Sequence, residues 1–279
     1  MFELTRTVRF CLSDGSPAGG SIPPQQTSCA NSFAAWPAMR GLGRYYELDV
    51  HCAGQADPQT GYFINIKQID AAVRQDVLDY FEGLIAHPAT HPADTPMGQI
   101  MQDILNLLQP PLHDCVKQIA LHLTPTYHLT LTSDAMDTVT ISQQFDFAAA
   151  HRLHVPELSA EENRAIFGKC NNPAGHGHNY RVEVSVDLPI DPSGHVAAIA
   201  ELDELVNRCV IEPLDHKHLN RDVPAFANRN PSVEHIAQVI WEMLVDQVDG
   251  LGAVDGSRLA QIRVWETEKT CCTYRGGQA

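Results

Sequence analysis

Residues 178–204, HNYRVEVSVDLPIDPSGHVAAIAELDE, contain a strand, a turn and the start of a helix, and this order decides the fold. Apolar residues alternate with polar ones up to Leu188, and a period of two predicts a half-buried β-strand. Asp191 and Pro192, followed closely by Gly194, are typical of a turn. The sequence therefore predicts that the strand ends here and that a helix follows.

A second stretch of the chain has the same order. Residues 44–70, RYYELDVHCAGQADPQTGYFINIKQID, also alternate and then reach Asp57, Pro58 and Gly61. A recurring order of this kind is the signature of an internal repeat. The alternative is that two unrelated α+β halves share a similar rhythm.

The rest of the second half completes one unit. TVTISQQFDFAAAHRL (138–153) predicts an earlier strand, and AQIRVWETEKTCCTYRG (260–276) predicts a hairpin with its turn near Glu268 and Lys269. Two helical patterns lie between, the second with Ser232 as its expected N-cap. The apolar positions are Val139, Ile141, Phe145, Phe147, Tyr180, Val182, Val184, Val186 and Leu188 in strands, and Leu202, Leu205, Val206, Cys209, Val210, Ile236, Val239, Ile240, Met243 and Leu244 in helices.

The first half repeats the later elements too. MGQIMQDILNLL (97–108) parallels VEHIAQVIWEML (233–244), and QIALHLTPTYHLTL (118–131) parallels the terminal hairpin. We therefore expect an α+β fold of two tandem ββααββ units. The units are expected at residues 1–134 and 135–279.

Composition excludes several classes of protein. The 279 residues carry a formal net charge of -15, and no run of lysine or arginine could follow a phosphate backbone, which argues against a nucleic-acid partner. No segment has the roughly 18 to 20 unbroken apolar residues that a membrane span requires, and no signal peptide is recognisable. We expect a cytoplasmic protein whose 8 cysteines are mostly free thiols.

Three histidines form the first candidate site. His176 and His178 are two residues apart at the start of a strand, so both imidazoles point to the same side, with Gly177 expected to leave room between them. His151, at the end of the preceding strand, offers a third imidazole. Three histidines leave a tetrahedral zinc with one open position, as catalytic zinc sites do. The alternative is a pair of surface histidines.

Cys170 lies six residues before His176, in a polar loop beside Lys169. We expect the lysine to favour the thiolate. The cysteine could be a fourth zinc ligand, a small buried apolar residue or a base beside the metal.

The Asp215–His216 pair and Glu266 are further candidate functional residues. Asp215 precedes His216 in a polar loop, and a carboxylate beside an imidazole can orient and charge it, although such a pair is commonly solvated surface. Glu266 lies on a strand with apolar neighbours and could grip two parallel N–H donors of a flat heterocycle. Its alternative is an ordinary exposed strand glutamate.

These residues lie in motifs that resemble one family. FDFAAAHRL, FGKCNNPAGHGHNY, PLDHKHLN, NPSVEHIA and VWETE, in this order within residues 138–276, are similar to 6-pyruvoyl tetrahydropterin synthase and 6-carboxytetrahydropterin synthase. The resemblance implies a T-fold, in which ββααββ units assemble into a barrel, and a homo-oligomer with active sites at subunit interfaces. It implies 7,8-dihydroneopterin triphosphate as the substrate.

The resemblance also implies roles for single residues. His151, His176 and His178 would bind Zn²⁺, and Cys170 would remove a carbon-bound proton. Asp215 and His216 would relay protons, and Glu266, with Ser232 near it, would bind the pterin ring. Triphosphate would leave in an internal redox change that needs no nicotinamide or flavin. The spacing from Cys170 to His176 favours the pyruvoyl product over the carboxy product.

The first unit departs from this pattern. On the overlay its histidine pair falls on Leu42 and Arg44, its upstream histidine on about Asp14 and its glutamate on Leu123. A unit without these ligands cannot bind zinc or a pterin, so we expect it to be structural. Its own His87 and His91 are separated by prolines and are expected in a solvated loop.

Two other functions stay open at this stage. A catalytically inactive pterin-binding or scaffold protein would fit the degenerate first unit. A zinc hydrolase would use the three histidines to activate water.

Overall fold

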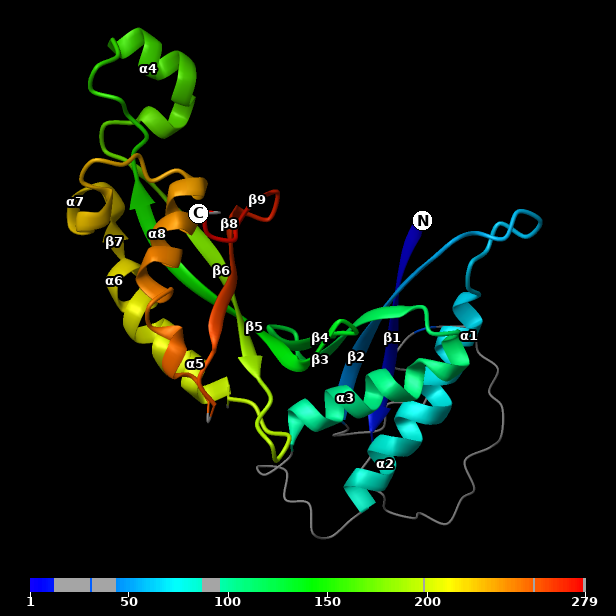
Figure 1. Cartoon of the computed structure of the whole chain (residues 1–279). Helices are drawn as coiled ribbons and strands as arrows, with labels where there is room; N and C mark the ends of the chain where they lie inside the picture. The colour runs from blue at the N-terminus through cyan, green and yellow to red at the C-terminus, as the bar shows by residue number, and fades with distance from the viewer. Residues whose placement is uncertain (13–30, 32–43, 87–95, 198, 253, 278–279) are drawn as a thin grey trace. The chain divides into compact units, whose positions relative to one another are not determined.

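The computed structural model describes residues 1–12, 31, 44–86, 96–197, 199–252 and 254–277 (Figure 1). Residue contacts divide the chain into two compact units, Met1–Val139 with Pro189–Val196, and Thr140–Leu188 with Ala197–Ala279. The tandem boundary at residue 134 stays a prediction, because contacts define compact units and not repeats. No described helix is long and apolar enough to cross a membrane.

The first unit contains a sheet with helices packed on it (Figure 1). The sheet runs in the order β1-β2-β3-β4 and continues into the first residues of β5, with antiparallel pairing from β1 to β4. Helix α3 packs on β3 and β4, while α1 and α2 pack on β1. The elements are β1 (Phe2–Leu12), β2 (Arg44–Gly54), α1 (Ile66–Ala72), a π-helical turn (Val73–Val77), α2 (Leu78–Ala86), α3 (Met97–Leu108), a 3₁₀ turn (Pro110–Leu112), β3 (Val116–Thr124) and β4 (Tyr127–Thr132).

The second unit has the same kind of layering, with α8 packed on β8 and β9 (Figure 1). Its sheet has the order β5-β6-β8-β9, and the two-residue strand β7 pairs parallel to β5. The elements are β5 (Ala135–His151), α4 (Ala160–Phe167), a 3₁₀ turn (Gly168–Asn171), β6 (His176–Pro189), α5 (Ile199–Val206), a π-helical turn (Asn207–Ile211), α6 (Glu212–Leu214), β7 (Lys217–His218), α7 (Leu219–Asp222), two 3₁₀ turns (Pro224–Phe226 and Val248–Gly250), α8 (Val233–Leu244), β8 (Arg258–Thr267) and β9 (Thr270–Tyr274).

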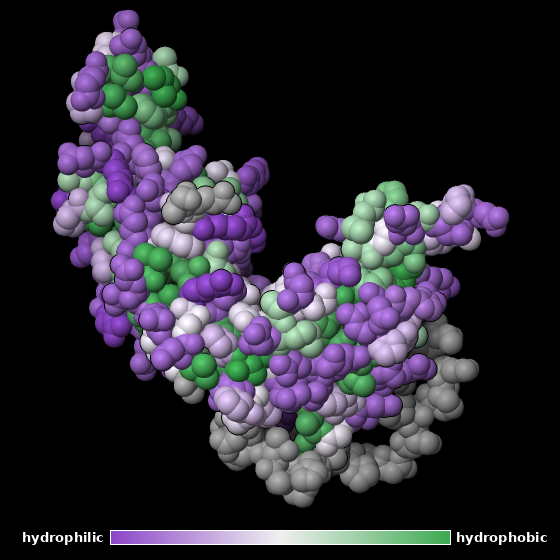
Figure 2. Space-filling view, in the orientation of Figure 1, coloured by the Kyte–Doolittle hydropathy of each residue, from purple (hydrophilic) through white to green (hydrophobic). Residues whose placement is uncertain are grey.

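The hydrophobic pattern predicts the core of the second unit well. Every strand residue expected to be buried is buried, and so are the helix residues except Cys209 and Met243, which are half-buried. Ser232 caps α8 as expected, since its hydroxyl accepts a hydrogen bond from the backbone N–H of His235. Hydrophilic side chains cover much of the visible face of each unit, with apolar ones between them (Figure 2).

One helix was not expected. Helix α4 lies between the first two strands of the second unit, where the expected ββααββ order has no helix. Its N-terminus is a capping box, in which Ser159 accepts from the backbone of Glu162 and Glu162 accepts from the backbone of Ser159. The S-x-x-E spacing that signals this cap is readable in the sequence.

Helix α1 of the first unit and helix α5 of the second are followed by the same kind of turn at equivalent places. In each unit the α-helix is followed by a π-helical turn, Val73–Val77 in the first and Asn207–Ile211 in the second. The interval from Tyr46 to Val73 equals that from Tyr180 to Asn207. π-helical turns are rare, so a match in position is informative.

Aromatic pairs also recur at equivalent positions. Phe10 packs against Tyr46 with ring centroids 5.8 Å apart, and Phe147 stacks on Tyr180 at 5.0 Å. In the overlay of the two halves, these are the same pair of positions. The first two strands of each sheet are therefore joined by the same kind of ring contact.

The turn after β6 packs on the first turn of α3. Gly194 accepts from the backbone N–H of Gln99 at 3.0 Å, which satisfies a donor that the helix itself leaves unpaired. A Cβ on Gly98 would lie 2.6 Å from Ile190 Cγ2 and 2.9 Å from the Gly194 oxygen. The close approach of this turn therefore requires glycine at residue 98.

Gly98→Ala is expected to destabilise the protein by about 1–3 kcal/mol, because the added methyl overpacks the contact with the Ile190 side chain and the Gly194 backbone oxygen. Gly83→Ala, in exposed α2 with no atom within 4 Å of the new Cβ, should stabilise by about 0.5–1 kcal/mol. Urea denaturation of both variants measures this. Equal effects would contradict the packing described for Gly98.

Candidate active site

Three imidazoles meet where β5 ends and β6 begins. His151 is the last residue of β5, and His176 and His178 stand two apart at the start of β6. The Nε2 atoms of His151 and His176 are 3.2 Å apart. The ring of His178 lies 5.1 Å from that of His151 and 4.7 Å from that of His176. The expected ligand set is thus close together in space.

The glycine that shapes this turn is Gly175 and not Gly177. A Cβ on Gly177 would be in ordinary contact with Ala149, at 3.6 Å, so the expectation that Gly177 must leave room is wrong. Gly175 has a φ of 77°, and a Cβ there would lie 2.7 Å from His218 Nε2 and 3.0 Å from the His151 oxygen. A side chain at Gly175 would be strained and would clash.

Burial keeps the central imidazole neutral. His151 is fully buried, and burial lowers its pKa to about 4, against an opposing hydrogen bond to the Pro231 carbonyl. Burial also lowers the pKa of His176. Because the Pro231 oxygen can only accept, His151 Nδ1, at 2.7 Å, must carry the proton. The Nε2 lone pair of His151 is therefore free to bind a metal.

The geometry fits zinc. Two ligands of a tetrahedral zinc with bonds of about 2.05 Å are about 3.3 Å apart. The His151 and His176 Nε2 atoms are separated by 3.2 Å. The Nε2 atom of His178 is buried without a hydrogen-bond partner in the described part of the chain. A buried nitrogen without a hydrogen-bond partner calls for one, and a cation held by all three imidazoles would supply it.

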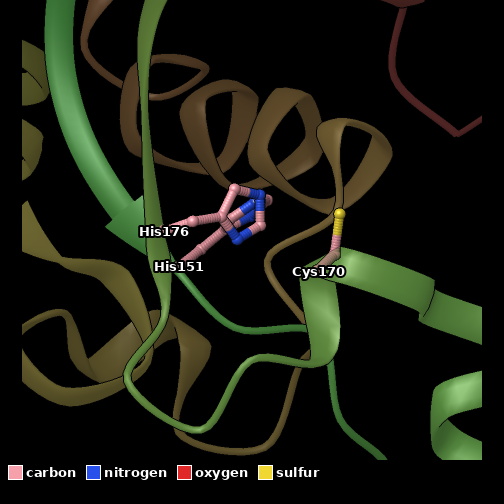
Figure 3. A group of neighbouring side chains, drawn as sticks. All are labelled: His151, Cys170 and His176. Atoms are coloured by element: carbon pink, nitrogen blue, oxygen red, sulfur yellow. The ribbon is translucent and has the colours of Figure 1, made fainter.

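Cys170 faces this centre from a different segment (Figure 3). Its Sγ lies within 4.8 Å of a ring nitrogen of both His151 and His176. The half-buried thiol has a raised pKa, because burial disfavours the thiolate and the Glu266 carboxylate repels it. The expectation that Lys169 favours the thiolate is therefore wrong for the protein alone.

The Glu266 side chain extends from β8 toward His151 and His178. Its Oε1 atom is 3.6 Å from His151 Nε2 and 3.8 Å from His178 Nε2. The carboxylate is therefore close enough to act as a further metal ligand with His151 and His178. The Ser232 hydroxyl caps α8. The carbonyl of its neighbour Pro231 accepts the hydrogen bond from His151 Nδ1.

Asp215 and His216 form the expected pair. Asp215 Oδ2 is 2.7 Å from His216 Nδ1, and Asp215 Oδ1 accepts from the Ala148 backbone. The hydrogen bonds from Ala148 and His216 lower the pKa of Asp215. The His216 side chain is 82% exposed. No described contact joins this pair to Cys170 within the chain.

His218 lies near this histidine centre, and the sequence analysis did not predict it. Both of its ring nitrogens are buried without a hydrogen-bond partner among the described residues, and its Nε2 abuts Gly175. Its positive form would further lower the pKa of His151. The signal was the H-x-H spacing of His216 and His218, the same spacing that marked His176 and His178.

Known proteins resemble this half of the chain. A family profile described as 6-pyruvoyl tetrahydropterin synthase matches residues 140–277. The 6-pyruvoyl tetrahydrobiopterin synthase of Poecilia reticulata is 43% identical over 137 residues, covering 49% of this chain and 89% of that protein. That of Homo sapiens is 42% identical over 137 residues, with 49% and 90% covered. A solved structure of Caenorhabditis elegans 6-pyruvoyl tetrahydropterin synthase is 36% identical, with a TM-score of 0.45 over 50% of this chain and 96% of that one.

The three imidazoles should bind about one Zn²⁺ per chain. His178→Ala should weaken Zn²⁺ binding by at least about 100-fold, because it removes a ligand whose buried Nε2 has no other partner among described residues. Calorimetric titration of metal-free protein measures this. His216→Ala, which removes an exposed imidazole, is the control and should bind as the unmodified protein does. Equal affinity for both variants would rule out His178 as a ligand.

Proposed function

Because the chain belongs to the 6-pyruvoyl tetrahydropterin synthase family, we propose that its second unit is a zinc-dependent lyase acting on 7,8-dihydroneopterin triphosphate. The product is a 6-substituted tetrahydropterin, and triphosphate is released. The names of the similar proteins favour the 6-pyruvoyl product over the 6-carboxy product. We further propose a cytoplasmic location.

The observation that carries this proposal is the placement of a thiol beside three imidazoles. Cys170 Sγ lies within 4.8 Å of two of the histidines, although it comes from a separate turn. A structural zinc site would use the thiol as a fourth ligand and leave no open position. A lyase needs the thiol as a base and the open position for substrate.

Each residue then has a defined task. His151, His176 and His178 would hold Zn²⁺, which when bound supplies a positive charge that polarises the hydroxyls of the substrate side chain. Cys170 takes a carbon-bound proton. Triphosphate leaves with its bonding electrons, and the side-chain carbons are oxidised as the pyrazine ring is reduced, so no external oxidant is needed.

Glu266 would bind the pterin ring, and the structure favours Glu266 of the same chain. Its carboxylate lies within 4 Å of His151 and His178 of its own unit. A carboxylate can accept two parallel N–H bonds from a flat heterocycle. Ser232 lies at the start of α8 beside Pro231, which contacts His151, and is proposed to line the same pocket.

Asp215 and His216 are proposed to relay protons across an interface between copies of the chain. The imidazole of His216 is mostly exposed, while its Nδ1 is held by Asp215. An exposed, oriented imidazole is suited to exchange protons with a group outside its own unit. A homo-oligomer with interfacial active sites would bring such a pair to the Cys170 of another copy.

The two units are proposed to be tandem T-fold repeats that assemble into a barrel. The matching π-helical turns and ring pairs support the repeat, and so do the turns at Asp57 and Asp191. Both aspartates accept backbone N–H bonds from the residue two positions on, at 3.0 and 2.7 Å.

The first unit is proposed to be structural. Its overlay positions include Arg44 and Leu123, which cannot ligate zinc, whereas the positions at Asp14 and Leu42, like His87 and His91, lie outside the described residues. An inactive pterin-binding scaffold is the main alternative function, and a zinc hydrolase is less consistent with a thiol at the centre.

Incubation with 7,8-dihydroneopterin triphosphate and Zn²⁺ should release triphosphate and a tetrahydropterin that mass spectrometry identifies. Cys170→Ala should lower kcat by about 10²- to 10⁴-fold while zinc stays bound, because only the base is lost. Cys271→Ala, at an exposed thiol on β9, is the control and should stay active. Loss of zinc from Cys170→Ala would make Cys170 a ligand, and absence of turnover in the unmodified protein would favour the scaffold.

A fragment of residues 135–279 should form smaller assemblies or be less soluble than the full chain. The fragment lacks β4, the strand that pairs with β5, and an uncovered sheet edge invites non-native pairing. Light scattering coupled to size-exclusion chromatography measures the assembly. A fragment as active as the full chain and identical in assembly would refute a structural role for the first unit.

A further inference from the structure

Four consecutive residues after His151 have no regular secondary structure. Residues 152–155 leave β5 and belong to neither a helix nor a strand. Their backbone N–H and C=O groups therefore lack ladder partners and must be satisfied in another way. Asparagine side chains from distant segments supply those partners.

Asn220 and Asn171 hold the first two of these residues. Asn220 Oδ1 accepts from the backbone N–H of Arg152 at 2.8 Å, and its Nδ2 donates to the Arg152 oxygen at 2.9 Å. Asn171 Nδ2 donates to the oxygen of Leu153 at 2.7 Å. One asparagine comes from α7 and the other from the turn that carries Cys170.

Asn230 and Asn163 form hydrogen bonds with the backbone of the next two residues, His154 and Val155. Asn230 Oδ1 accepts from the backbone N–H of His154 at 2.8 Å. Asn163, which is fully buried, accepts from the N–H of Val155 at 2.8 Å and donates to its oxygen at 2.9 Å. These four side chains, Asn163, Asn171, Asn220 and Asn230, are called the asparagine clamp.

The clamp joins the thiol to the metal-binding strand. The backbone N–H of Leu153 donates to the oxygen of Cys170 at 2.8 Å, and Asn171 bonds the other side of the same residue. Leu153 is two residues from His151. Two hydrogen bonds therefore fix the Cys170 turn to the strand end that presents His151.

We propose that Asn171 and Asn220 are positioning residues that set the distance between the Cys170 thiol and the metal-binding histidines. Asn171 lies next to Cys170 and bonds Leu153. Asn220 bonds the backbone of Arg152, the residue after His151. A catalytic function for that distance rests on the proposed lyase activity, whereas the placement of the thiol does not.

The chain offers a closely matched control. Asn172 directly follows that turn and is exposed, and within the described chain its side chain accepts only from the N–H of Ala174, at 3.1 Å. Asn171→Ala and Asn172→Ala thus make the same chemical change one residue apart. Only the first removes a bond to Leu153.

The experiment compares both variants of the full chain in three measurements. Zinc content should be within twofold of the unmodified protein in both. The iodoacetamide alkylation rate of Cys170, followed by mass spectrometry of its peptide, should rise by about tenfold in Asn171→Ala alone, because the freed turn exposes a half-buried thiol. Its kcat should fall by about 10- to 100-fold with KM within about threefold, since a small displacement of a reacting group is costly.

Three results would overturn the proposal. Asn171→Ala could match Asn172→Ala in alkylation and kcat, it could lose zinc, or it could change KM alone. If Asn171→Ala does not fold, Asn220→Ala is judged by the same three measurements from the other side of the link. If the unmodified protein proves inactive, the proposed function fails, and the alkylation rates still decide whether the clamp places the thiol.

Discussion

The buried hydrogen bond from His151 to the Pro231 carbonyl is the contact on which the site depends. It links the end of β5 to the start of α8, two elements 80 residues apart in sequence. Because the carbonyl can only accept, the bond places the proton of His151 on Nδ1 and directs the Nε2 lone pair toward the other imidazoles. Full burial of His151 keeps the ring neutral, so a metal need not compete with a proton near neutral pH.

The rest of the centre is assembled around that fixed ring. His176 and His178 follow from the period of β6, Glu266 extends from the neighbouring strand β8, and Cys170 comes from a turn outside the sheet. Strands are rigid supports for metal ligands, whereas a turn must be tied down before it can place a base. The hydrogen bond from Asn171 to the Leu153 oxygen is such a tie between the Cys170 turn and the chain that follows β5.

The proposed tandem repeat would combine one fold with two different sets of functional residues. Phe10 and Tyr46 repeat the ring contact of Phe147 and Tyr180, and the π-helical turn recurs after the same interval. These features belong to packing and depend on shape alone. The proposed zinc site depends on imidazole nitrogens and the proposed pterin contact on a carboxylate, and Arg44 and Leu123 at the overlay positions supply neither.

The sequence by itself determined the strands, the two main helices and the three histidines, because each depends on local periodicity or on a short spacing such as that of His176 and His178. It did not indicate α4, although Ser159 and Glu162 carried the signal, and it assigned to Gly177 a constraint that belongs to Gly175. Only the tertiary structure decided that burial and the Glu266 carboxylate raise the pKa of the Cys170 thiol, that His216 is exposed, and that four asparagines converge on residues 152–155. The physical reason is that burial, charge proximity and hydrogen bonding between distant segments are properties of the folded chain, which no local pattern of residues contains.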